Sequence, residues 1–188
     1  MKSIIEVGNR IIKREIDALT QLSNSLDENF AQAVNAIFKC KGNVILSGIG
    51  KPCFIAQKIS ASMASTGTPS ITIHPVDALH GDIGRIRNGD IVILLSNSGA
   101  SREIIEFAKA TMEFDVTLIA ITCRKDSSLA ETSHICLDLG PLTEACPLGV
   151  APSTTSTAML ALGDASTFAV LELKAINIYD FSRLHPGG

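Results

Sequence analysis

The chain has 188 residues, of which 46% are hydrophobic and 19% are charged. This composition is typical of a globular protein and excludes a disordered tail protein. The formal net charge is −3, and there is no basic stripe to neutralise a phosphate backbone, so we expect no nucleic-acid partner. Aromatic residues make up 4% of the chain and Trp is absent, so stacking platforms for bases or sugar rings are scarce.

The cysteines and the uncharged segments indicate where the protein works. The five cysteines are odd in number and form no C-x-x-C pair, which favours reduced, mostly buried thiols in the cytoplasm. The segment Met1–Glu6 becomes charged too soon to form the apolar core of a signal peptide. The longest uncharged run, residues 145–163, contains Pro147 and Pro152. We therefore expect loop and helix there, and no membrane span.

The N-terminal residues 1–42 predict helices. Apolar residues recur at helical spacing over residues 3–40, which indicates two helices. Ser25 and Glu28 have the spacing of a capping box, which predicts that the second helix begins there.

Residues 43–176 alternate between short apolar runs and helical segments. We predict strands at 44–47, 70–74, 90–96, 116–122 and 134–137, and helices at 52–66, 101–113 and 153–176. This alternation predicts a parallel sheet covered on both faces. Because ligands bind beyond the carboxyl ends of such strands, the polar loops at 48–51, 74–82 and 96–101 mark the expected site.

Two of these loops can be compared with known phosphate-binding patterns. The loop at 48–51 is neither a Walker motif nor a dinucleotide fingerprint, because Ile45 and Cys53 stand where each pattern needs glycine, so we expect no nucleotide cofactor. Clustered metal ligands are absent as well, so we expect no metal. The segment Ser96–Ser101 places hydroxyls and amides at a helix N-terminus, which favours a phosphate monoester. Its alternative interpretation is a serine-rich N-cap turn.

Several motifs along the chain carry a family resemblance. They are Ser47-Gly48-Ile49-Gly50-Lys51, residues 64–70, His80-Gly81-Asp82, Ser96-Asn97-Ser98-Gly99, Glu144-Ala145-Cys146-Pro147-Leu148-Gly149 and Leu184-His185-Pro186-Gly187-Gly188. On these residues the chain resembles the sugar isomerase (SIS) domain family and, within it, the D-arabinose-5-phosphate isomerases. The Glu144–Gly149 motif and the terminal His-Pro-Gly-Gly are the more specific of these signals.

The resemblance implies a fold, an assembly and a reaction. The implied fold is one SIS domain over residues 1–188, a three-layer α-β-α structure with a central parallel sheet of about five strands, in which the tail at 177–188 contributes to the active site. The implied assembly is a homotetramer with shared active sites. The implied reaction interconverts D-ribulose 5-phosphate and D-arabinose 5-phosphate through an enediolate, and supplies Kdo for lipopolysaccharide or capsule.

Matching the family's motifs residue by residue gives two expected sets. The catalytic set is Lys51, His80, Glu103, Glu144 and His185, and the substrate-binding set is Gly50, Thr68, Ser96, Asn97, Ser98 and Ser101.

The chemistry of these residue types suits the implied reaction, although each has a plainer alternative. An aldose–ketose isomerase needs a base for a carbon-bound proton, a group that stabilises the enediolate, and an acid that opens the sugar ring. Glu144 is the candidate base, because desolvation in its apolar surroundings raises a carboxyl pKa; alternatively it caps a backbone amide. Lys51 can neutralise the enediolate or the phosphate, or it is a solvated lysine. His80 and His185 can serve ring opening, or they are a structural loop residue and part of a disordered tail.

Glu103 is the second candidate base. Its alternative role is to complement the dipole at the start of its helix. We interpret His74 and His134 as structural.

The chain departs from the family pattern in three places. Ala100 replaces a residue that is often polar, and Pro52-Cys53 replaces a Ser-Gly pair, which predicts a stiffer helix start. Many members continue into paired cystathionine-synthase-type regulatory modules after the position of Gly188. This chain stops at Gly188, so we expect either that this regulation is absent or that the chain is a truncation. In the first case, we expect that an activated Kdo nucleotide, CMP-Kdo, inhibits at the active site itself. Two other functions stay open: a non-catalytic phosphosugar-binding module, and an isomerase for a hexulose or heptulose phosphate.

Overall fold

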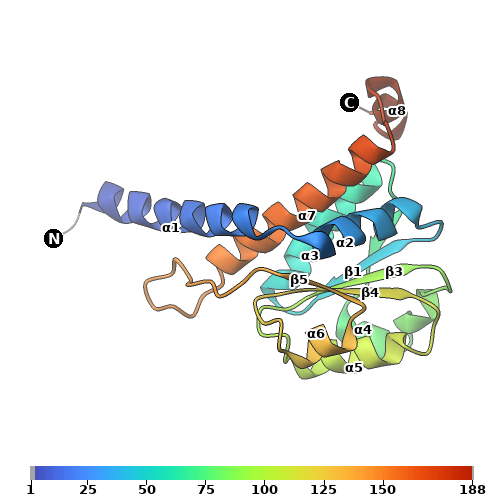
Figure 1. The fold of residues 1–188 in the computed structure, drawn as a ribbon, viewed down its shortest axis with the longest axis horizontal. Coiled ribbons are helices and arrows are strands. Elements are labelled where there is room, and N and C mark those ends of the chain that lie inside the picture. Colours follow the sequence, from blue (N-terminus) through green and yellow to red (C-terminus); the bar gives the residue numbers. More distant parts are fainter. Residues whose placement is uncertain (1–2, 188) are drawn as a thin grey trace.

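The computed structural model describes residues 3–187 and confirms the three-layer architecture, with helices on both faces of a five-stranded parallel sheet (Figure 1). The strands are β1 (Val44–Gly48), β2 (Ser70–Thr72), β3 (Ile91–Leu95), β4 (Thr117–Thr122) and β5 (Ile135–Asp138). The helices are α1 (Ile4–Ser25), α2 (Glu28–Lys39), α3 (Lys51–Ser65), α4 (Pro75–Leu79), α5 (Arg102–Thr111), α6 (Ser128–Thr132), α7 (Thr154–Leu173) and α8 (Ile178–Leu184), with a 3-10 turn at Asp82–Arg85.

The strand order creates a crevice at one edge of the sheet. The order is β2-β1-β3-β4-β5, so the chain moves outward from β1 to β2 and then returns to place β3 on the other side of β1. In register, Gly48 at the end of β1 lies beside Leu95 at the end of β3. The connections after these two strands therefore leave in opposite directions, and a crevice opens between them.

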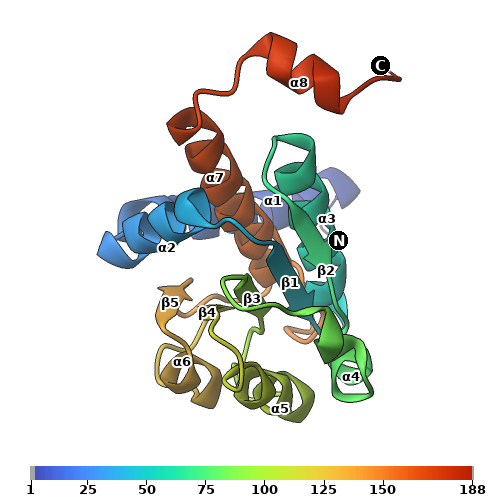
Figure 2. The ribbon, with the colours of Figure 1, turned by 90° about the vertical axis from the view of Figure 1, so that its right-hand side faces the viewer.

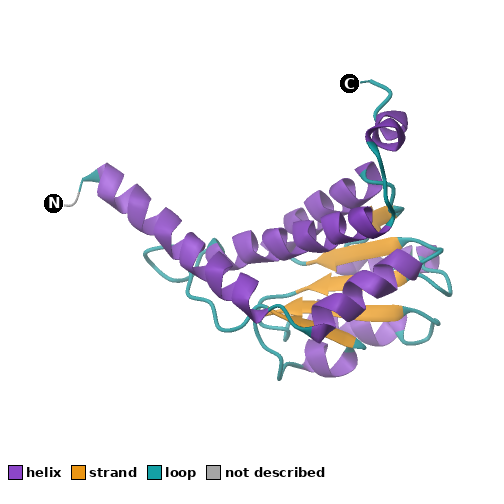
Figure 3. Ribbon diagram, turned by 45° about the horizontal axis from the view of Figure 1, so that its top comes forward, coloured by secondary structure: helices purple, strands orange, loops and turns teal. Residues whose placement is uncertain are grey.

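Two hydrophobic cores hold the helices to the sheet. Alternate residues of a strand face opposite sides, so Leu46 packs in the core with α2, α3 and α7, while Ile45 packs in the core with α4, α5 and α6. The two helical layers are visible on either side of the strands in Figure 2, and Figure 3 shows the strands between them. Because both faces are covered, β3 is apolar throughout, and all five of its residues are buried.

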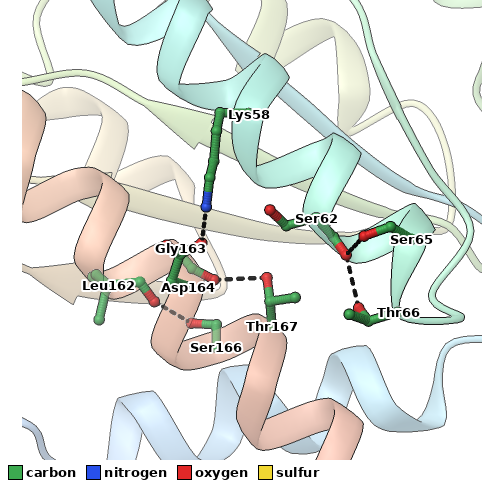
Figure 4. A network of polar contacts seen from close by, with 9 residues as sticks. All are labelled: Lys58, Ser62, Ser65, Thr66, Leu162, Gly163, Asp164, Ser166 and Thr167. Atoms are coloured by element: carbon green, nitrogen blue, oxygen red, sulfur yellow. Dashed lines mark hydrogen bonds and ion pairs between the residues drawn. The ribbon is translucent and has the colours of Figure 1, made fainter. Parts of the chain in front are cut away.

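Helices α3 and α7 approach each other closely (Figure 4). A Cβ at Gly163 of α7 would overlap the side chain of Ile59 of α3, so this glycine permits the contact. Lys58 and Asp164 form an ion pair across the same two helices, with Nζ 2.5 Å from Oδ1. This packing fixes α7, whose N-terminus lies at the crevice.

The structure corrects one predicted helix boundary. The expected capping box at Ser25 and Glu28 is wrong, because the side chain of Asp27 caps α2 by accepting a hydrogen bond from the Asn29 amide. Ser25 instead ends α1, and its hydroxyl donates to the Leu22 carbonyl. Short helices that the sequence did not indicate, α4, α6 and α8, have five to seven residues each, too few for a helical period to show.

The N-terminal half of α1 projects beyond the sheet (Figure 1). Ala18 and Leu22 near its C-terminal end are buried, whereas Ile4 is 91% exposed and Ile12 is 58% exposed. The apolar face of α1 therefore extends beyond the part of the helix that packs against the rest of the described chain.

None of the helices within residues 3–187 has the length and apolarity needed to cross a membrane. Of the five cysteines, Cys123 is buried and the other four are half-buried, so the expectation of mostly buried thiols was too strong.

Candidate active site

A cavity of about 330 Å³ lies at the crevice between the ends of β1 and β3. Its lining residues are Ile49, Gly50, Lys51, Pro52, Leu95, Ser96, Asn97, Ser98, Ser101, Pro152 and Thr155. The cavity brings together six of the predicted site residues, namely Gly50, Lys51, Ser96, Asn97, Ser98 and Ser101. They come from the loops after β1 and β3, as expected for a ligand site at a switch point of strand order.

The loop after β3 is a tight turn that two of its own serine hydroxyls hold in shape. The Ser96 hydroxyl accepts a hydrogen bond from the Gly99 amide at 3.1 Å, and the Ser98 hydroxyl accepts one from the Ala100 amide at 3.2 Å. Gly99 is buried with a φ of 60°, and a Cβ there would overlap the Ser127 hydroxyl. Only glycine therefore fits this turn without strain.

Helix α5 begins at the cavity with an open N-terminus. Ser101 is its N-cap residue, and within the described chain its side chain makes no capping hydrogen bond. The first amides of a helix lack partners within the helix and carry the positive end of its dipole. Together with the hydroxyl of Ser98, they form a site suited to a phosphate group. Glu103 lies in the first turn of α5, is half-buried, and is not among the residues that line the cavity.

Lys51 begins α3 at the rim of the cavity. It follows Gly50, which has a φ of 68°, and precedes Pro52 in the first turn. The fixed φ of this proline suits the first turn of a helix, and the stiffer helix start stays a prediction. The Lys51 side chain is exposed, so its ammonium can meet an anionic ligand in the cavity.

Glu144 lies in the loop before α7, and hydrogen bonds engage both oxygens of its carboxylate. Oε2 accepts from the Ser153 amide at 2.7 Å and from the Ser153 hydroxyl at 3.1 Å. Oε1 accepts from the Thr155 hydroxyl at 2.5 Å, and the Thr155 amide lies 3.4 Å from Oε2. The carboxylate thus caps the start of α7, which is the plainer of its two predicted roles.

These contacts overturn the predicted pKa of Glu144. Burial raises the pKa of this carboxyl, as expected, but the hydrogen bonds from Thr155 and Ser153 outweigh it and leave the pKa below its ordinary value. Hydrogen bonds to the charged form favour that form. Glu144 is therefore ionised at neutral pH, and its basicity is weakened rather than enhanced.

Besides Glu103 and Glu144, three further predicted residues do not line the cavity in the described chain. Thr68 is buried ahead of β2, at the amino ends of the strands, where its hydroxyl accepts a hydrogen bond from Lys174 at 2.9 Å. His185 follows α8, stacks on Phe181, and lies on the side where Leu184 approaches Gly67. Thr68 and His185 are therefore at the opposite edge of the sheet from the cavity. His80 caps the C-terminus of α4 with an exposed side chain and is not among the lining residues.

The two histidines interpreted as structural bind backbone amides. His74 caps α4 by accepting from the Val76 amide, and Nδ1 of His134 accepts from the Leu118 amide at 2.9 Å. This agrees with their interpretation.

Sequence reasoning missed Thr155. It lines the cavity, is 3% exposed, and bonds Glu144. The available signal was the run of hydroxyl residues from Ser153 to Thr157, which begins a helix directly after Pro152. That run was interpreted only as part of a helix.

A larger hollow of about 630 Å³ lies near the C-terminal ends of α2 and α7, between Cys40 and Lys174. Its lining includes lysine side chains, but within the described residues no hydroxyl or carboxyl side chain lines it. An isomerase site needs both acid–base groups and a phosphate anchor, so the cavity at the crevice is the better candidate.

Comparison with known proteins places this fold and cavity in a family. Residues 37–169 match the family described as the SIS domain. The chain belongs to the SIS domain family. Among curated SIS relatives, the arabinose 5-phosphate isomerase KdsD of Escherichia coli K12 is 40% identical over 97% of this chain, and KpsF of Escherichia coli O6:H1 is 44% identical over 91%.

The chain spans about half the length of these curated SIS relatives, 56% of KdsD and 53% of KpsF. A solved SIS structure matches over its whole length. An Escherichia coli CFT073 protein in complex with arabinose 5-phosphate has a TM-score of 0.94 and 36% identity, with 99% of this chain and 100% of that chain covered.

Proposed function

We propose that the protein is an aldose–ketose isomerase that interconverts D-ribulose 5-phosphate and D-arabinose 5-phosphate. The observation that carries this proposal is one cavity lined by the open N-terminus of α5, the serine turn and Lys51. Thr155 also lines it and donates a hydrogen bond to the Glu144 carboxylate. The names of the KdsD and KpsF relatives and the arabinose 5-phosphate complex of the solved relative support the substrate.

Each group of residues in and beside the cavity has a different role in this reaction. The Ser96–Ser101 turn and the first amides of α5 hold the phosphate. The Lys51 ammonium stabilises the negative charge that develops on the enediolate oxygens. Glu103 is the candidate base for the carbon-bound proton, and Glu144, which reaches the cavity through Thr155, moves protons between the sugar oxygens. The reaction needs no metal or nucleotide in this scheme.

We place the reaction in the cytoplasm, where its product supplies the synthesis of Kdo for lipopolysaccharide or capsule. The names of the KdsD and KpsF relatives support this role. The absence of a membrane-crossing helix within residues 3–187 is compatible with it.

A complete active site in this proposal needs a second copy of the chain. His185 lies at the opposite edge of the sheet from Lys51, so the His185 that serves a given cavity comes from the C-terminal tail of a neighbour in a homotetramer. The exposed isoleucines of α1 offer an apolar surface for that association.

Mixing two inactive variants tests this sharing. Glu144→Gln and His185→Ala chains, unfolded and refolded together, regain part of the activity if each site draws on two chains. Activity that stays at the sum of the two separate variants contradicts the shared site, and sedimentation velocity gives the oligomeric state independently.

Replacing Ser98 with Ala tests the phosphate anchor. The variant loses a hydroxyl that lines the cavity, and the phosphate is bound in the ground state and in the transition state alike. We therefore expect KM for ribulose 5-phosphate to rise roughly tenfold while kcat changes little. Steady-state kinetics measures both constants, and a fall in kcat at constant KM would place Ser98 in the chemical step instead.

One observation favours a second candidate function. The engaged carboxylate of Glu144 suits a non-catalytic phosphosugar-binding module, which needs the serine turn but no base. An assay against pentulose, hexulose and heptulose phosphates separates the candidates. Binding without turnover of any of them supports the module, and turnover of a longer sugar phosphate alone changes the substrate.

The proposal includes inhibition of the isomerase by CMP-Kdo, bound at the active site. This nucleotide sugar carries a phosphate and an anionic sugar, which suit the first amides of α5 and the Lys51 ammonium. We expect inhibition that is competitive with ribulose 5-phosphate and weaker in Lys51→Ala, with cytidine monophosphate as the control. Non-competitive inhibition, or none at millimolar inhibitor, contradicts it.

A further inference from the structure

Thr155 connects the cavity to Glu144. Among the residues that line the cavity, it is the one whose side chain bonds the Glu144 carboxylate in the described chain, with Oγ1 2.5 Å from Oε1. An ionised carboxylate only accepts hydrogen bonds, so the Thr155 hydroxyl is the donor. Its oxygen keeps lone pairs that can accept a further hydrogen bond from a molecule in the cavity.

The remaining contacts of Glu144 hold it in the wall rather than in the cavity. The second oxygen is engaged by the amide and the hydroxyl of Ser153, and neither Glu144 nor Ser153 is among the lining residues. A carbon-bound proton must be taken directly by a base within hydrogen-bond reach. The proton of a hydroxyl group, by contrast, can pass along a hydrogen-bonded chain of oxygens.

We propose that Thr155 is a proton relay through which Glu144 moves protons between the two oxygens of the bound sugar, and that Glu144 does not act on the carbon-bound proton. This inference rests on the proposed isomerase function. It assigns to Thr155 a part in the reaction, and it leaves the carbon-bound proton to Glu103.

In the conversion of aldose to ketose, the relay moves one proton from O2 to O1 of the sugar. After the proton on C2 has been removed, the negative charge lies on O1 of the enediolate. The O2–H bond then breaks as its proton moves to Oγ1 of Thr155, and the proton of Thr155 moves to Oε1 of Glu144. The electron pair left on O2 forms the C2=O bond, and C1 receives the proton that the carbon base carries. Return of the relayed proton to O1 restores the Thr155 hydroxyl and the Glu144 carboxylate.

An arginine and a cysteine lie near Glu144. The Arg14 guanidinium of α1 donates to the backbone carbonyl of Glu144 at 3.1 Å. The Cys123 thiol, after β4, has a pKa that burial, then Asp138 and Glu144, raise to about 12. Of the carboxyl and the thiol, Glu144 is thus the group whose charge changes in acid.

The test compares Thr155→Val, which keeps the shape and removes the hydroxyl, with Thr155→Ser, which keeps the hydroxyl. Thr157→Val is the matched control, since Thr157 lies on the same helix but outside the cavity lining. Isomerisation is measured as kcat and KM. Exchange of the carbon-bound proton is measured by NMR in heavy water.

We expect kcat of Thr155→Val to fall about 10²-fold with little change in KM, while exchange of the carbon-bound proton with solvent continues near the wild-type rate. Thr155→Ser restores most of kcat, and Thr157→Val behaves as wild type. Because the Thr155 hydroxyl lowers the pKa of Glu144, the acidic limb of the kcat profile moves to higher pH in Thr155→Val.

The outcomes separate this inference from the proposed function. If the wild-type protein isomerises and Thr155→Val has the same kcat as Thr155→Ser, the relay is overturned, but the proposed isomerase function is not. Exchange and isomerisation that fall together overturn it as well, because Glu144 would then act on carbon. Wild-type protein without isomerase activity overturns the proposed function and the relay with it.

Discussion

Replacing Glu144 with Gln is expected to lower kcat for ribulose 5-phosphate by about 10²–10⁴-fold, with little change in KM. Gln keeps the size of the side chain and most of its hydrogen-bonding capacity, but an amide cannot take up the proton that Thr155 delivers. The effect is confined to kcat because the phosphate is held elsewhere, by the Ser96–Ser101 turn.

The pH dependence of the Tm of Glu144→Gln provides a second, independent test. The folded-state pKa of Glu144 lies below its ordinary value, so its carboxylate stabilises the fold above the unfolded-state pKa. That contribution is lost as the pH falls through the folded-state pKa. We therefore expect the Tm of wild type to exceed that of Glu144→Gln at neutral pH, and the difference to shrink in acid.

Glu106→Gln is the matched control for both measurements. Glu106 lies on α5 and pairs with Arg102, and its side chain is exposed to solvent. Exposed pairs of this kind contribute at most about 0.5 kcal/mol, so kcat and Tm stay close to wild type. An unchanged kcat in Glu144→Gln would reduce Glu144 to a helix cap and remove it from the reaction.

Replacing Gly99 with Ala is expected to damage the phosphate turn and the fold together. A side chain at positive φ costs about 1–2 kcal/mol, and the new Cβ would also overlap Ser127. At about 2–4 °C per kcal/mol for a chain of this size, Tm falls by several degrees. Displacing the turn separates Ser98 and the first amides of α5 from the phosphate, so KM rises roughly tenfold or more.

Gly84→Ala is its control. A Cβ at Gly84 would meet no heavy atom within 4 Å, and the residue has no positive φ, so neither strain nor overlap is expected. Equal Tm and KM in the two alanine variants would show that the turn tolerates a side chain, and would contradict the account of the anion site. Thermal unfolding and steady-state kinetics are sufficient for the comparison.

The sequence predicted the layers because their signals are local. The apolar run of β3 marks a strand buried on both faces, and the serine turn that follows it marks an anion site at a helix start. The strand order β2-β1-β3-β4-β5 was not predicted, since it depends on which side of the sheet each crossover takes. The short helices α4 and α6 were missed because five residues show no period.

The candidate site was only partly predictable for a similar reason. Gly50, Lys51 and the Ser96–Ser101 turn directly follow strands, so their place at the crevice follows from the fold. The state of Glu144 depends on hydrogen bonds from residues nine and eleven positions away, across an irregular loop. Composition suggested desolvation, but no pattern in the sequence shows that Ser153 and Thr155 turn back to the carboxylate.

Conversion of ribulose 5-phosphate to arabinose 5-phosphate by the purified, chelator-treated chain tests the central claim most directly. We expect the reaction to proceed in both directions to the same equilibrium mixture, with no added metal or nucleotide, and Lys51→Ala and Glu144→Gln to slow it strongly. Binding of either sugar phosphate without conversion, or conversion that returns only with one added metal, would contradict the account.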